Sequence, residues 1–151
     1  MGFLDGLKSK SQQMNQQLST KKSQLKSKEF AQGSMAMCAL IAAADGSIDP
    51  VEQRKTNEVI STNDVLSIFD PRDLQEIFDK YANKLRADYQ LGKVEAIQAV
   101  GKLRGKPDQA RATIQIGIII GGADGNFDPC EQTAVREACN ALGIAPSEFD
   151  L

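Results

Sequence analysis

The sequence predicts an all-α fold, and three observations lead to this prediction. Aspartate followed by proline, a strong helix-start signal, recurs at 49–50, 70–71 and 128–129. Between such signals, apolar residues recur at helical spacing. Aromatic residues are few, with six Phe, two Tyr and no Trp, and a core of small aliphatic residues suits packed helices better than sheets. Because 151 residues are enough for one core, we expect a single-domain bundle of about seven helices.

The first element is a basic N-terminal arm, residues 1–29, which we separate from a helical domain over 30–151. Six of the 18 basic groups and only two of the 20 acidic groups lie in residues 1–30, so the rest of the chain is acidic. The arm carries an interrupted apolar stripe: Leu4, Leu7, Met14, Leu18 and Leu25. Two interpretations remain open, a flexible solvated arm and a basic amphipathic helix that binds a membrane surface or a partner.

The domain itself divides into helices at its start and stop signals. A helix rich in small residues is expected over 30–45, ended by Gly46. A second begins at Pro50 and a third after Asp70-Pro71, with Leu74, Ile77, Phe78, Tyr81 and Leu85 on one face. The remaining helices are expected over 92–103, from Pro107 to Gly125, from Pro129 to a stop at Gly143, and in a last turn at Pro146.

One segment carries conflicting signals. The stretch TIQIGIIIGG (113–122) is rich in β-branched residues and resembles a strand when it is read alone. It lies 79 residues after SMAMCALIAA (34–43), whose composition is helical, within an internal repeat. Because repeated units share a backbone conformation, we predict a helix here and two helix–loop–helix units related by a pseudo-two-fold.

The repeat is clearest in two acidic loops, AAADGSIDPVEQ (42–53) and GGADGNFDPCEQ (121–132). Helix capping explains much of this pattern, because Asp49 and Asp128 can cap the next helix, proline can follow, and glutamate can fold back onto the cap. Asp45 and Asp124 lie at the expected C-terminal ends of the preceding helices, where the helix dipole disfavours an acid. Helix capping therefore does not explain these two residues.

Metal binding is the functional alternative for these loops. Each copy matches the second half of an EF-hand calcium loop, with glycine at the sharp turn and acids at positions nine and twelve. Positions one and three would be Ile41 and Ala43, or Ile120 and Gly122, none of which has a side-chain oxygen. Water, backbone carbonyls or the other loop would have to complete the site. Oxygen ligands favour Ca²⁺, Mg²⁺ or Mn²⁺, and the candidate ligands are Asp45, Asp49, Glu52, Asp124, Asp128 and Glu131.

Several function classes are excluded by composition. The chain has no histidine, which removes the usual general base and the commonest transition-metal ligand, and it has no phosphate-binding glycine loop. Its three cysteines form no CxxC pair, and no signal peptide precedes them, so we expect a cytoplasmic protein. Cys38 and Cys139 are expected to be buried and inert, whereas the role of Cys130, in the first turn of a helix, stays open.

The chain resembles the TerB family of tellurite-resistance proteins over nearly its whole length. The resemblance rests on SMAMCALIAAADG, VLSIFD, LGKVEAI and, most specifically, IGIIIGGADGNFDPCEQTAVREACNALGIAPSEFDL. It implies an all-helical TerB bundle, a role in resistance to tellurite and other chemical stress, and metal chelation by the six acidic loop residues named above. It also implies partners: a TerC-type membrane protein and TerD-like calcium-binding proteins.

Together these observations favour a non-enzymatic scaffold or sensor that binds a divalent metal and meets membrane-associated partners at the inner membrane face. The alternative is a metal-dependent hydrolase or phosphoryl-transfer enzyme that uses the loop carboxylates. A protein-binding bundle without metal is a third interpretation. Nucleic acid is not an expected partner, because the body is acidic and the arm lacks the aromatic residues that stack on bases.

Overall fold

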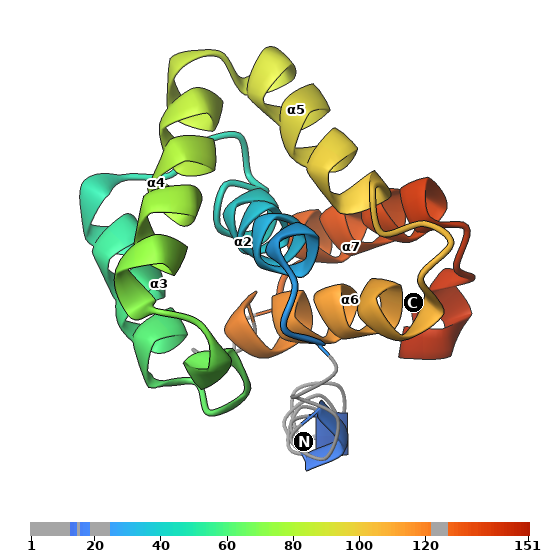
Figure 1. Cartoon of the computed structure of the whole chain (residues 1–151). Helices are drawn as coiled ribbons and strands as arrows, with labels where there is room; N and C mark the ends of the chain where they lie inside the picture. Colours follow the sequence, from blue (N-terminus) through green and yellow to red (C-terminus); the bar gives the residue numbers. More distant parts are fainter. Residues whose placement is uncertain (1–12, 15, 19–24, 122–126) are drawn as a thin grey trace, which may run out of the picture.

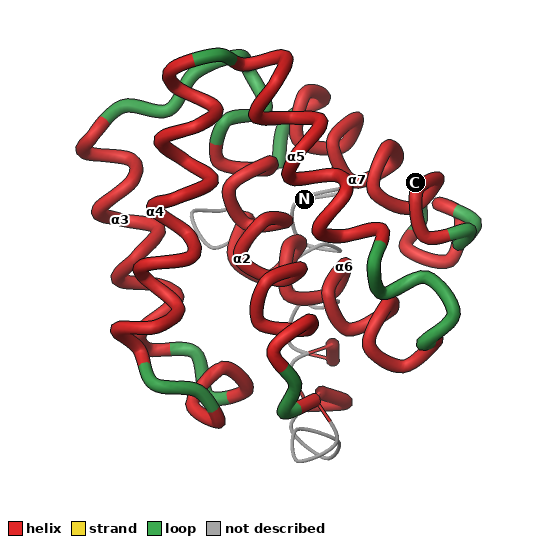
Figure 2. The backbone as a smooth tube through the Cα atoms, turned by 45° about the horizontal axis from the view of Figure 1, so that its top comes forward, coloured by secondary structure: helices red, strands yellow, loops and turns green. Residues whose placement is uncertain are grey.

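A computed structural model describes residues 13–14, 16–18, 25–121 and 127–151. These residues form helices and loops and contain no strand (Figure 2), which confirms the all-α prediction. The elements are α2 (Lys28–Ala42), α3 (Pro50–Thr62), the 3-10 helix η2 (Val65–Ile68), α4 (Pro71–Ala87), α5 (Tyr89–Gly101), α6 (Pro107–Gly121), α7 (Pro129–Leu142) and the 3-10 helix η3 (Pro146–Phe149). None of the described helices is both long and apolar enough to cross a bilayer.

The central element is α2, which the helices α4, α5, α6 and α7 surround (Figure 1). Between Phe30 and Ile41 every side chain of α2 except Gln32 is buried. A helix that is apolar on nearly all sides must be enclosed by other elements, and small residues such as Ala36 and Ala39 let the neighbours approach closely. By contrast, α3 buries only Ile60 and lies on the outer side of α4 (Figure 1).

The predicted helix starts are confirmed at the aspartate–proline signals. Asp49, Asp70 and Asp128 are the N-caps of α3, α4 and α7, and each carboxylate accepts a hydrogen bond from a backbone N–H of the first turn. The predicted stop at Gly143 is also confirmed, because this residue adopts the left-handed conformation with φ 72°. Local capping chemistry therefore sets most boundaries of the bundle.

Two boundaries differ from the sequence prediction. The helix predicted over 30–45 begins at Lys28, because Ser27 caps it, and ends at Ala42, so Gly46 with its φ of +102° lies in the following loop. The helix predicted over 92–103 begins at Tyr89, because the carboxylate of Asp88 accepts a hydrogen bond from the N–H of Leu91 at 3.2 Å. The predicted end of the sixth helix at Gly125 lies outside the described residues.

The β-branched stretch is helical as far as it is described, as the repeat predicted, and forms the second half of α6. It packs on α2 at a crossing where Thr113 donates a hydrogen bond to Ser34 at 3.3 Å, between two fully buried hydroxyl groups. These two residues are 79 positions apart, so equivalent positions of the two copies meet each other. Gly117 permits the close approach, since a Cβ there would lie 2.6 Å from Cγ of Met37. Burial against α2 outweighs the low helix propensity of isoleucine.

The described part of the N-terminal arm lies against this core. Met14 and Leu18 are in helical residues of the arm and, with Leu25, are buried in the same apolar cluster as α2 and α6. The amide of Gln115 on α6 also donates to the side chain of Gln17 at 3.4 Å. Three residues of the arm's apolar stripe are therefore packed into the protein and are not presented to a membrane.

Candidate functional site: two acidic capping loops

The first acidic loop is held by a capping box at the start of α3. The N–H of Glu52 donates to Oδ1 of Asp49 at 2.8 Å, and the N–H of Asp49 donates to Oε1 of Glu52 at 3.4 Å. The backbone N–H of Glu52 lowers the pKa of the Asp49 carboxyl, because that hydrogen bond stabilises the charged form. The sequence predicted this box, and the structure confirms it.

Charge is crowded around the exposed carboxyl of Glu52. Its pKa is raised, first by partial desolvation, then by the side-chain hydrogen bond with Asp49 and by the negative charges of Asp49 and Asp45, although the backbone N–H of Asp49 acts in the opposite direction. Asp45 is exposed, and its Oδ1 accepts a hydrogen bond from the N–H of Ser47 at 3.2 Å. Asp45, which helix capping did not require, thus shapes the loop and adds charge to it.

A clamp from α4, which sequence reasoning missed, fixes the same loop. Nε of Arg86 donates to the carbonyl of Ile48 at 3.1 Å, and its guanidinium also contacts the side chain of Gln53. Gln53 in turn donates to Asp79 at 2.8 Å. No sequence signal links Arg86 to residues 48 and 53, because the contact depends on the packing of α4 beside α3.

The second loop repeats the box with a different clamp. The N–H of Glu131 donates to Oδ1 of Asp128 at 2.8 Å, and the N–H of Asp128 donates to Oε1 of Glu131 at 3.1 Å. Here Gln132 itself donates to the carbonyl of Phe127 at 3.2 Å. Phe127 is buried like Ile48 in the first loop, so an apolar anchor precedes each capping aspartate.

The predicted metal ligands do not form a three-ligand site in the described part of the chain. Asp45, Asp49, Glu52, Asp128 and Glu131 have the right donor chemistry for a hard cation. However, the described residues hold no group of three or more Asp, Glu or Cys side chains that could bind a metal ion. Asp124 lies outside the described residues, and so does the end of the second loop that precedes Phe127. The capping bonds occupy Oδ1 of Asp49 and Oε1 of Glu52.

The thiols belong to two environments. Cys38 and Cys139 are buried, as the sequence predicted, and burial raises the pKa of Cys38 to about 12 and that of Cys139 to about 11. Both are therefore protonated and unreactive at neutral pH. Cys130 is exposed in the first turn of α7.

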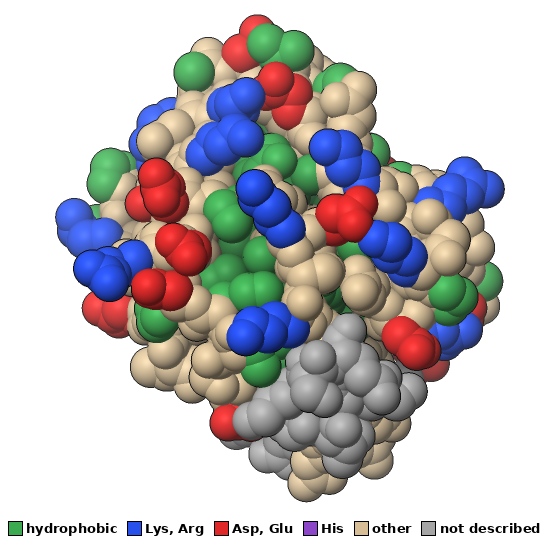
Figure 3. Space-filling view, viewed as in Figure 1, with side chains coloured by type: hydrophobic (Ala, Val, Ile, Leu, Met, Phe, Trp, Pro, Cys, Tyr) green, Lys and Arg blue, Asp and Glu red, His purple; other side chains and the backbone are tan. Residues whose placement is uncertain are grey.

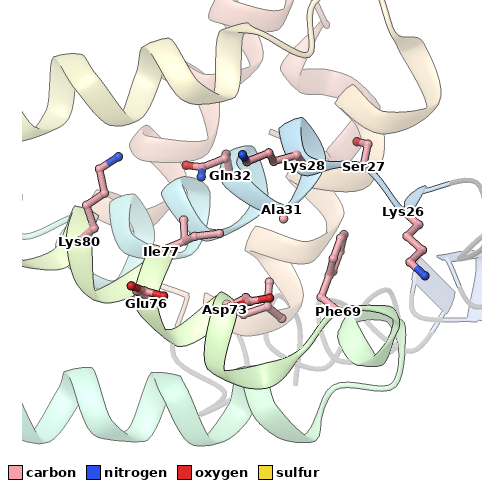
Figure 4. A pocket seen from close by; sticks show the side chains of 11 residues that line it. Lys26, Ser27, Lys28, Ala31, Gln32, Phe69, Asp73, Glu76, Ile77 and Lys80 are labelled. Carbon is pink, nitrogen blue, oxygen red and sulfur yellow. The ribbon is translucent and has the colours of Figure 1, made fainter.

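A hollow of about 780 Å³ lies elsewhere, between the N-terminal part of α2 and α4 (Figure 4). Its apolar lining includes Ala31, Phe69, Leu74 and Ile77. The acidic loop that follows α2 is at the other end of that helix. Sequence analysis did not detect this hollow, because two of its apolar residues, Leu74 and Ile77, only indicated a core-facing helix side.

Comparisons with known proteins agree on one family. The family model described as "Tellurite resistance protein TerB" matches residues 31–151. The chain is also similar to "Tellurium resistance protein TerB" from an Alcaligenes species, with 28% identity over 118 residues that cover 78% of this chain and 97% of that protein. No solved structure gives a significant match.

Proposed function

The chain belongs to the tellurite resistance protein TerB family, and on this basis we propose that it is a non-enzymatic scaffold or sensor in tellurite and chemical-stress resistance. The match covers α3 to α7, almost all of α2 and both acidic loops. The observation that carries the proposal is the pair of matching capping boxes, which place the same acidic segment, residues 49–52 and 128–131, at the starts of α3 and α7. Loops held on a rigid scaffold are suited to recognition.

The first part of the proposal concerns divalent cations. We propose that the loops take up Ca²⁺, Mg²⁺ or Mn²⁺ through Asp45, Asp49, Glu52, Asp124, Asp128 and Glu131. The crowding of charge at Glu52 supports this, because a cation would relieve the repulsion between neighbouring carboxylates. Because Asp124 lies outside the described residues, we assign no coordination geometry.

Titration calorimetry of chelator-stripped protein tests the cation proposal. We expect saturable binding of at least one of the three cations, and we expect an Asp45→Asn/Asp124→Asn variant to lose it while its unfolding free energy stays within about 0.5 kcal/mol of the parent. These residues are chosen because the capping boxes do not use them.

The matched control is Asp73→Asn/Glu76→Gln, which removes the same charge from exposed positions of α4 and should leave ion binding unchanged. Absence of heat with all three cations would contradict ion binding and leave the loops as helix caps on an acidic docking surface. Equal losses in both double variants would show a nonspecific charge effect.

The second part concerns the membrane. We propose that the lysines of the arm bring the protein to an anionic membrane surface, where it meets a TerC-type membrane protein and TerD-like proteins. Because Met14, Leu18 and Leu25 are buried in the protein, they do not contact lipid in this structure. The attraction that we propose is therefore electrostatic, between the lysines of the arm and anionic lipid headgroups. Removal of the whole arm would also remove Leu25 from the core, which makes substitution a cleaner test than deletion.

Sedimentation with vesicles that contain anionic lipid tests membrane contact. Replacement of Lys8, Lys10, Lys21 and Lys22 by glutamine should reduce vesicle binding by up to about a thousandfold, because each lysine at the surface contributes on the order of one kcal/mol. The control replaces four lysines of the domain, Lys55, Lys80, Lys84 and Lys102, and should retain binding. If the arm variant bound as the parent does, the membrane proposal would be wrong.

Two hollows lined by described residues give the enzymatic alternative no support. The larger one lies at the N-terminal part of α2, away from the loop that follows this helix. The smaller one, of about 240 Å³, lies between the arm and α6 and includes Leu18 and Arg111. A metal-dependent hydrolase would need its substrate pocket beside the acidic loops, and the lining of neither hollow includes a residue of these loops.

A further inference from the structure

The hollow beside α2 is an open groove with an apolar floor. Ala31 and Leu74 are buried at its base, and the partly exposed Phe69 and Ile77 line it. Figure 3 shows hydrophobic atoms exposed in the middle of this face, with lysines and acids around them. The small side chain of Ala31 leaves room above α2, so the floor is lower than its charged edges.

Charges of opposite sign line the two long edges of the groove. Lys26 and Lys28 stand at the start of α2, and Asp73 and Glu76 follow α4 on the opposite side (Figure 4). Lys80 of α4 lies at the far end of the groove, beyond Glu76. The four side chains on the long edges are exposed, and none of them belongs to an ion pair within 4.0 Å in the described part of the chain. Their charges are therefore available to a ligand.

From this arrangement we propose that the groove is a docking site for a short amphipathic helix of a partner protein, with acidic residues along one flank and basic residues along the other. The apolar face of such a helix would lie on Phe69, Leu74 and Ile77. Its acidic flank would meet the lysines of α2, and its basic flank would meet Asp73 and Glu76. This site lies away from the loop after α2, so it does not depend on ion binding.

A helix fits this groove better than a small molecule. The groove residues of α4 run from Asp73 to Lys80, which is two helical turns or about 10 Å. That length matches apolar anchors at positions i, i+3 or i+4, and i+7 of a docked helix. A drug-sized ligand usually has most of its surface buried in an enclosed site, whereas this groove is exposed along its charged edges.

Fluorescence anisotropy with one designed peptide tests the proposal. The probe is a labelled, Ala-rich helical peptide with leucines along one face, glutamates along one flank and lysines along the other. We expect it to bind the parent protein saturably, and we expect a peptide with serines in place of the leucines not to bind. Lys28→Glu and Glu76→Lys should each weaken binding by about fivefold, because each turns attraction into repulsion at one edge.

The fourfold variant Lys26→Glu/Lys28→Glu/Asp73→Lys/Glu76→Lys separates docking from general damage to the fold. It exchanges the signs of these four edge charges, so the same peptide can bind after it turns end for end in the groove. Binding should return to within about twofold of the parent. Lys55→Glu, the same charge change on α3 outside the groove, should leave binding unchanged.

Three results would overturn the assignment. The first is no saturable binding of the leucine peptide to the parent. The second is a fourfold variant that binds no better than either single variant. The third is self-association of the parent, measured by sedimentation and abolished by Glu76→Lys, which would identify a second copy of this chain as the occupant.

Discussion

We expect Gly92→Ala to lower the free energy of unfolding by about 3 kcal/mol, the upper part of the range for overpacked sites. A Cβ at this position would lie 2.7 Å from the backbone N of Leu85 and 2.8 Å from its Cα. These atoms belong to α4, and the backbone cannot move aside as the end of a side chain can. The connection is also tight, because Asp88 ends α4 and caps α5. Urea denaturation followed by helical circular dichroism measures the loss.

Gly101→Ala is the matched control at the end of the same helix. The nearest atom to a Cβ at that position is the carbonyl oxygen of Ala141, at 4.0 Å. The same substitution should therefore be neutral or should stabilise the protein by about 0.5 kcal/mol, because alanine restricts the unfolded chain more than glycine does. Equal losses at both positions would show that the close approach of α5 to α4 is not the cause.

The parts of the fold that sequence predicted best are those that depend on neighbouring residues. Asp49, Asp70 and Asp128 each cap the helix that their own proline begins, and both capping boxes close within four residues. The repeat also corrected a misleading local signal, because the helical first copy identified α6 as a helix. Its isoleucines alone would have indicated a strand.

Contacts between distant segments could not be predicted in this way. The clamp from Arg86 to the carbonyl of Ile48 joins α4 to the first loop, and the groove arises where Ala31 of α2 faces Ile77 of α4. Neither follows from the spacing of residues along one helix. The same limit applies to the candidate site: sequence identified carboxylates in both loops, but whether they meet depends on tertiary packing.

A second large effect is expected at Gly117, where α6 crosses α2. A Cβ there would lie 2.6 Å from Cγ of Met37 and 3.0 Å from Cδ1 of Ile41, so Gly117→Leu should cost about 3 kcal/mol of unfolding free energy. Met37→Ala alone should cost about 2–5 kcal/mol, because it leaves a cavity in a fully buried position. The two changes complement each other, since the added leucine can fill the space that Met37 leaves.

The double variant Gly117→Leu/Met37→Ala should therefore be more stable than the sum of the two single losses predicts, by about 1 kcal/mol or more. A double-mutant cycle from urea denaturation measures this coupling. Strict additivity would mean that the leucine is accommodated elsewhere and that Met37 does not set the distance between the helices.

The same crossing should also position the first acidic loop, because Ile41 lies one residue before the end of α2. Leucine at position 117, without the compensating change at Met37, should therefore displace that loop. Changed amide chemical shifts of Gly46 and Ser47 in Gly117→Leu, and their recovery in the double variant, would show that the helix crossing positions the loop.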